Sequence, residues 1–185
     1  MRRWPFGFPR TRHATGDGRT PVRVAAFVAL LALPLFTSVA EAQDVGIAIG
    51  TVPAAVAVQD LDGNDVDLGQ WIGSKPVLVQ FWATWCPICE ALEPRVRAVQ
   101  DRFGDRLEIL IIAVGVNQSP RSIRRHIANH TPPGRVLFDA RGRAARAFEA
   151  PSTSYIVVLD RAGRTVYTGV GEDQDLVGAA EKAVR

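Results

Sequence analysis

Two cysteines separated by two residues, Cys86 and Cys89, lie where an apolar strand is expected to give way to a helix. The apolar run 77–82 predicts a buried strand, and Pro87–Phe103 predicts a helix that begins with proline and carries one apolar face. The first thiol is thereby placed at a helix N-terminus, where unpaired N–H groups and the helix dipole favour a thiolate. The second thiol follows within one turn, close enough to close a disulfide. The spacing therefore predicts a two-electron thiol–disulfide switch.

The N-terminal region has the organisation of a secretory signal peptide. Residues 1–23 are basic, residues 24–36 form an apolar run, and residues 37–42 are small or polar. The last of these, Ala40-Glu41-Ala42, fit a small-x-small cleavage site, so we expect cleavage after Ala42. The alternative is an uncleaved membrane anchor over Val24–Ala40, which is short for a membrane span and contains a proline.

This leader divides the chain into three parts. We expect a signal peptide or anchor, a linker and a single domain, at residues 1–42, 43–50 and 51–185. Either form of leader delivers the domain to the periplasm or to the extracytoplasmic face of the inner membrane. A cysteine pair in an exported chain often forms a structural disulfide. Here the closed loop is so short that it removes little unfolded-state entropy, which favours a redox role.

The positive charge of the chain is concentrated in the leader. The formal net charge is +3, but residues 1–42 hold six arginines against two acidic residues, so the remainder carries one more acidic than basic side chain. A nearly neutral domain gives no electrostatic basis for binding nucleic acid.

The order of predicted elements indicates an α/β protein. The centre of the chain forms a β-α-β unit, which gives a partly parallel sheet covered by helices on both faces. A hairpin after this unit makes the sheet mixed. The predicted strands are 51–59, 65–68, 77–82, 107–116, 136–138, 154–159 and 164–169, and the predicted helices are 68–72, 87–103, 120–129, 144–148 and 174–184.

The nine residues from Phe81 to Cys89 resemble the active-site signature of thioredoxin-like proteins. Further matches indicate the extracytoplasmic TlpA/ResA/CcmG type, namely residues 73–79, Pro94, Phe138-Asp139, 151–153, Leu159-Asp160 and Gly163. The resemblance spans about residues 51 to 184 and implies a thioredoxin fold with an N-terminal β-hairpin extension. It also implies that Cys86 attacks a partner disulfide, that Cys89 resolves the product, and that no cofactor is needed.

The resemblance implies other site residues as well. Pro151 matches the cis-proline that packs against the active disulfide in this family. Ala150, just before it, is then expected to offer its backbone to an extended segment of the substrate. Trp85, Pro87 and Ile88 surround the attacking thiol and are expected to contact the substrate.

The acid that family members often keep beside the second cysteine is missing. The two matching positions hold Gln80 and Leu92, which cannot accept a proton from Cys89. Glu93, one position further on, is predicted to be a solvated helix charge. His126 and His130 share one face of a separate predicted helix, so we expect surface histidines and no metal site.

These observations predict a thiol–disulfide oxidoreductase that reduces disulfides in exported proteins, for example to keep apocytochrome c thiols ready for haem attachment. Its electrons would come from a membrane reductant, because the periplasm is oxidising. One alternative is a copper metallochaperone that binds Cu(I) through the cysteine pair, although Met1 is the only methionine. The other is a peroxiredoxin-type peroxidase, for which Thr84 stands one residue too close to Cys86.

Overall fold

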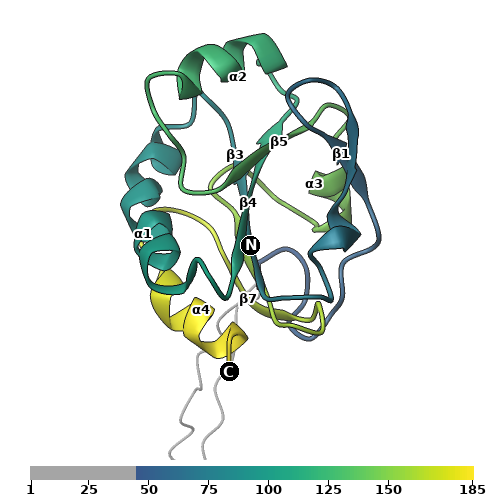
Figure 1. The fold of residues 1–185 in the computed structure, drawn as a ribbon, viewed down its shortest axis with the longest axis vertical. Helices are drawn as coiled ribbons and strands as arrows, with labels where there is room; N and C mark the ends of the chain where they lie inside the picture. Colours follow the sequence, from purple (N-terminus) through teal and green to yellow (C-terminus); the bar gives the residue numbers. More distant parts are fainter. Residues whose placement is uncertain (1–44) are drawn as a thin grey trace, which may run out of the picture. The chain divides into compact units, whose positions relative to one another are not determined.

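The computed structural model describes residues 45–185, which form a mixed sheet of seven strands with helices on both faces (Figure 1). The strands are β1 (Ala57–Gln59), β2 (Asp65–Asp67), β3 (Val77–Trp82), β4 (Glu108–Val114), β5 (Arg135–Asp139), β6 (Ile156–Leu159) and β7 (Thr165–Gly169). The helices are the 3₁₀ turn η1 (Leu68–Gln70) and the α-helices α1 (Pro87–Phe103), α2 (Pro120–Ile127), α3 (Arg143–Ala147) and α4 (Leu176–Ala183).

The strands lie in the order β2-β1-β5-β4-β3-β6-β7. Strand β4 pairs parallel with β3 and β5, because α1 and α2 carry the chain back across the sheet between them. Strand β6 joins β3 antiparallel and continues into the β6–β7 hairpin. The β1–β2 hairpin is added beside β5. This arrangement confirms the predicted thioredoxin fold with an N-terminal β-hairpin.

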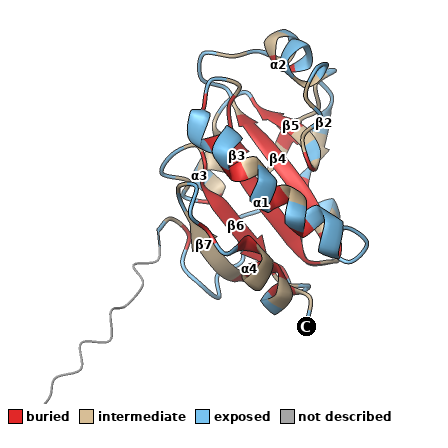
Figure 2. Cartoon of the chain, turned by 90° about the vertical axis from the view of Figure 1, so that its left-hand side faces the viewer, coloured by how far each residue is buried: buried red, intermediate tan, exposed pale blue. Residues whose placement is uncertain are grey.

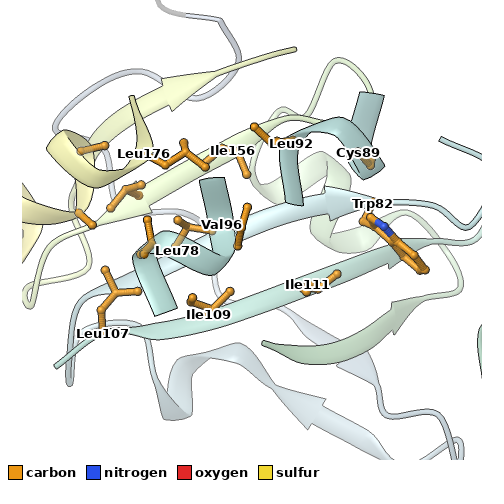
Figure 3. Packing of buried hydrophobic residues seen from close by; sticks show 14 of the residues in the cluster. Leu78, Trp82, Cys89, Leu92, Val96, Leu107, Ile109, Ile111, Ile156 and Leu176 are labelled. Atoms are coloured by element: carbon orange, nitrogen blue, oxygen red, sulfur yellow. The ribbon is translucent and has the colours of Figure 1, made fainter. Parts of the chain in front are cut away.

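Two apolar layers hold the helices on the sheet, because successive residues of a strand face opposite sides. On one face, Leu78 and Trp82 of β3 pack with the buried residues of α1 and α4 (Figure 3). On the other face, Val79 and Phe81 pack with α3 and η1. Figure 2 shows the central strands buried beneath α1, whose outer face is exposed. The carboxyl end of β3 is therefore fixed from both sides where it leads to the cysteines.

The first described residues, which lie in the expected linker over 43–50, pack on the domain. Ile47 is buried, and its N–H donates to the hydroxyl of Tyr155 at 3.1 Å. Burial raises the pKa of Tyr155 to about 12, so this hydroxyl stays protonated across the ordinary pH range. Gly46 beside it has φ 81°, and a Cβ there would lie 2.2 Å from the Tyr155 oxygen. The expected linker thus includes a segment that is anchored by its own apolar side chain.

The predicted leader over 1–42 and the alternative anchor Val24–Ala40 lie outside the described residues. Within residues 45–185, no helix is both long and apolar enough to cross a membrane.

Candidate active site

The cysteines form a disulfide at the start of α1, as their spacing predicts. Their Cα atoms are 5.3 Å apart. Cys86 is the N-cap residue of the helix, and its sulfur accepts a hydrogen bond from the Cys89 N–H at 3.1 Å. Cys86 is 8% exposed and Cys89 1% exposed, so the first sulfur is the one a partner can approach. Because the same N–H would point at a Cys86 thiolate, the helix start stabilises the nucleophilic form.

A loop after β4 holds the turn that presents Cys86. The side chain of Gln118 accepts a hydrogen bond from the Thr84 N–H at 3.0 Å and donates one to the Val114 carbonyl at 2.6 Å. The Trp85 indole N–H donates to the Val116 carbonyl at 2.9 Å. Gln118 therefore bridges Thr84 and Val114. The sequence indicates only a loop at Asn117-Gln118, because Thr84 and Gln118 are 34 positions apart and no local pattern links them.

Replacing Gln118 with alanine is expected to loosen this turn. Both hydrogen bonds of the bridge are lost, so the free energy of unfolding should fall by about 1–2 kcal/mol. Urea denaturation of the oxidised protein measures the change. Gln118→Glu keeps the acceptor for Thr84 but turns a carboxylate oxygen toward the Val114 carbonyl, so it should also be destabilised. Equal stability of the alanine variant and the wild type would contradict the bridging role.

An apolar groove runs from Trp85, the neighbour of Cys86, along the side of β4 and α3. It has a volume of about 620 Å³ and is lined by Trp85, Val116 and the segment 150–153, among others. Trp85 and Ile88 are each 47% exposed, an unusual setting for large apolar side chains. Pro87 is also exposed. All of the residues expected to contact a substrate therefore lie at the surface around Cys86 or in this groove.

The segment before β6 differs from the prediction at Pro151. All peptide bonds of residues 45–185 are trans, so the cis bond expected before Pro151 is absent from the structure. The N–H of Ala150 is already used, since it donates to the Ala145 carbonyl at 2.8 Å at the end of α3. Pro151 itself is exposed and lines the groove.

The chain enters β6 through Ser154, which the sequence did not single out. This residue is buried and has φ 65°, so the predicted strand 154–159 is shortened at its start. Its N–H donates to the Phe81 carbonyl at 2.9 Å, which fixes the segment against the end of β3. Thr153, just before it, makes no backbone hydrogen bond within the described residues. The free backbone groups beside the groove therefore include those of Thr153 and the carbonyl of Ala150.

A second cavity, of about 540 Å³ and lined by both polar and apolar side chains, contains Cys86 in its wall and lies between α1 and α2. Its lining includes Cys86, Glu93, His126 and His130. The two histidines, which were expected only as surface residues, thus share a cavity with Cys86. The ring of Trp82, at the end of β3, lies 5.4 Å from that of His126 and so packs α2 beside the site.

Glu93 is likewise not the solvated charge that the sequence suggested. Its side chain is 16% exposed and contacts the imidazole Nε2 of His130. Its other oxygen pairs with Arg97 at 2.6 Å. Gln80 and Leu92, at the two positions where the family acid was expected, are buried. Within residues 45–185, no three His, Cys, Asp or Glu side chains are arranged to hold a metal ion.

Comparison with known proteins finds thioredoxins and thiol-disulfide oxidoreductases among the relatives of this chain. A thioredoxin of Mycolicibacterium smegmatis is 35% identical over 101 residues, which covers 50% of this chain and 88% of that protein. The thiol-disulfide oxidoreductase ResA of Bacillus thuringiensis is 23% identical over 124 residues. The match covers 67% of this chain and 70% of that protein.

Solved structures share the fold. A putative thiol:disulfide interchange protein DsbE from Chlorobium tepidum superposes with a TM-score of 0.66 at 20% identity, covering 75% of this chain and 99% of that one. A secreted disulfide oxidoreductase of Mycobacterium tuberculosis gives a TM-score of 0.58 at 23% identity, covering 69% and 95%.

A cysteine pair at the start of the helix that follows the central strand of a mixed sheet defines a thioredoxin-like thiol–disulfide oxidoreductase. The resemblance to the TlpA/ResA/CcmG type that residues 81–89 suggested is thereby confirmed. The chain belongs to the Redoxin family, which matches residues 48–184.

Proposed function

We propose that this protein reduces disulfides of exported proteins outside the cytoplasm, and that a membrane reductant restores its own thiols. The observation that carries the proposal is the position of Cys86: it caps α1 between the exposed apolar side chains of Trp85 and Ile88, and Trp85 also lines the apolar groove. Such a site fits a disulfide within a polypeptide better than a small polar molecule.

The reaction needs two exchanges. The Cys86 thiolate attacks one sulfur of the substrate disulfide, a bond forms between them, and the second substrate sulfur leaves as a thiolate. Cys89 then loses its proton and attacks the Cys86 sulfur, which releases the first substrate sulfur. The substrate gains two electrons, and the protein ends as the Cys86–Cys89 disulfide, the form that the structure contains.

The groove is proposed to bind the chain that flanks the substrate disulfide. Trp85, Pro87 and Ile88 supply apolar contacts around the attacked sulfur. The unpaired backbone of Thr153 can add hydrogen bonds to an extended segment, as an exposed strand edge does. The carbonyl of Ala150 can accept a further hydrogen bond, and Pro151 contributes a wall of the groove.

The expected leader supports a site outside the cytoplasm, and the residues between the cysteines support a reducing rather than an oxidising role. A signal peptide or anchor over 1–42 would deliver the site to the periplasm or to the extracytoplasmic face of the inner membrane. Pro87 and Ile88 carry no charge and add nothing to the thiolate beyond the helix start, which argues against a strongly oxidising pair. Maturation of cytochrome c, where apoprotein thiols must be kept reduced, is the proposed setting.

A Cys89→Ser variant expressed in the exporting cell tests this function. Without the resolving thiol, Cys86 should stay joined to its substrates, and adducts should appear on non-reducing gels and vanish with dithiothreitol. The Cys86→Ser/Cys89→Ser variant is the control and should give none. Adding Trp85→Ala to Cys89→Ser should slow adduct formation several-fold by removing part of the groove. Absence of adducts, together with stoichiometric copper on the purified protein, would favour the metallochaperone alternative instead.

A further inference from the structure

The apolar groove that starts at Trp85 contains one charged side chain, that of Arg141. None of the other residues that line the groove can ionise. Arg141 is exposed, and its guanidinium makes no ion pair or hydrogen bond within residues 45–185. Arg124 and Arg135, by contrast, are paired with carboxylates. A guanidinium that is left free at the wall of a groove can bind a carboxylate through two parallel hydrogen bonds.

A second arginine adds positive charge beside this wall. Gly142 lines the groove next to Arg141. The Nη1 atom of Arg146 lies 3.2 Å from the place that a Cβ of Gly142 would occupy. Arg146 is exposed and, in the part of the chain that the structure describes, has no ion-pair partner either. Two guanidinium groups without partners therefore lie at the α3 side of the groove.

The acids close to these arginines along the chain do not neutralise them. Asp139 is buried, and its two carboxylate oxygens accept hydrogen bonds from the backbone N–H groups of Arg143 and Ala145, at 2.7 and 2.9 Å. Glu149, just after α3, is exposed, and it forms no ion pair with Arg146. The positive charge at the groove is thus available to a bound chain.

The cavity between α1 and α2 has no comparable excess of one charge. Glu90, Glu93 and Arg125 are among the residues that line it, so charges of both signs face it. Glu93 is already paired with Arg97 and contacts the imidazole of His130. A substrate chain that passes the attacked sulfur therefore meets a positive wall on the groove side and a mixed one on the cavity side.

We propose that the protein selects substrate disulfides by an acidic side chain, an aspartate or glutamate on one side of the substrate cysteine. This inference rests on the proposed function. The segment on that side lies in the groove, whose volume of about 620 Å³ is typical of a binding site. It contacts Trp85 through apolar atoms, and its carboxylate binds Arg141, with Arg146 adding to the attraction. Because opposite charges speed the encounter, the effect should appear in the rate of the first exchange.

Short peptides with a single cysteine test this selection. Each peptide has an alanine-rich sequence, holds its cysteine as a mixed disulfide with thionitrobenzoate, and carries one glutamate at a varied position before or after the cysteine. Matched peptides carry glutamine or lysine instead. Attack by the Cys86 thiolate joins the peptide sulfur to the protein and releases thionitrobenzoate, which is the better leaving group. The absorbance of the released thiolate therefore gives the rate of the first exchange.

Glutamate on one side of the cysteine should raise this rate about 3- to 5-fold over glutamine at low ionic strength, and added salt should remove most of the difference. Lysine there should lower the rate, and glutamate on the other side should change it little. Arg141→Gln should abolish the preference, and Arg141→Glu should reverse it in favour of lysine. Arg161→Gln is the control, because it removes the same charge from the exposed turn between β6 and β7. It should keep the wild-type preference.

Three results would overturn the inference. The first is an equal rate for glutamate and glutamine peptides at every position. The second is a preference that survives Arg141→Gln. The third is an equal loss of preference in Arg161→Gln, because it would assign the effect to net charge. A merely structural effect of Arg141→Glu would slow all peptides alike and would not favour lysine. Failure of the proposed function looks different, since the wild type would then form no adducts with exported proteins, even if it discriminated between the peptides.

Discussion

A Cys86→Ser variant is expected to lose at least about 1,000-fold in insulin-reducing activity, because the hydroxyl that replaces the thiol is not a nucleophile at neutral pH. Insulin reduction driven by dithiothreitol, followed through the turbidity of the released chains, measures the loss. Serine keeps the volume and can keep the capping position at the start of α1. The fold and the groove should therefore survive, and the loss should be confined to the chemical step.

The Cys89→Ser variant provides the contrast for this result. It keeps the attacking thiol, so it should consume one equivalent of substrate disulfide per protein and then stop as a mixed disulfide. The order of attack also has a structural basis, since Cys86 is 8% exposed and Cys89 only 1%. Retention of turnover by Cys86→Ser, or loss of the single equivalent in Cys89→Ser, would reverse the assigned roles.

The elements around the cysteines could be predicted because their causes are local. Pro87 fits the first turn of a helix, and the apolar spacing after it sets the buried face, so α1 was placed from Pro87 to Phe103 as observed. The second α-helix was located by Ser119-Pro120, whose serine caps the backbone N–H of Ser122. In both cases the residues that determine the start of the helix are neighbours in the sequence.

The polar side of the site could not be predicted, because it depends on contacts between distant segments. His130 and Glu93 are 37 residues apart and meet only after α2 has packed beside the end of β3. No pattern of neighbouring residues predicts that contact. The entry into β6 shows the same limit: the sequence favours Pro151 as the special residue, whereas the backbone change falls at Ser154, whose N–H pairs with Phe81.

The largest effect on stability is expected from Phe81→Ala, on the face of β3 opposite the cysteines. Phe81 is fully buried, and its ring centroid lies 5.7 Å from that of Phe148 and 5.9 Å from that of Tyr155. Truncation leaves a cavity between these two rings, which should lower the free energy of unfolding by about 3–5 kcal/mol. Urea denaturation at a fixed redox state measures the change through the midpoint and slope.

Phe81→Leu is the matched control, because it keeps most of the volume and should cost less than about 1.5 kcal/mol. The comparison also separates packing from chemistry. The Phe81 carbonyl accepts a hydrogen bond from the Ser154 N–H, and the Phe81 N–H donates one to the Tyr155 carbonyl, both at 2.9 Å. Neither bond depends on the Phe81 side chain. The folded fraction of Phe81→Ala should therefore react with insulin at close to the wild-type rate, while the total activity falls with that fraction on warming. Similar stabilities of the two variants would show that the ring cluster does not support β3, and the active-site turn would then have to be held from the α1 face alone.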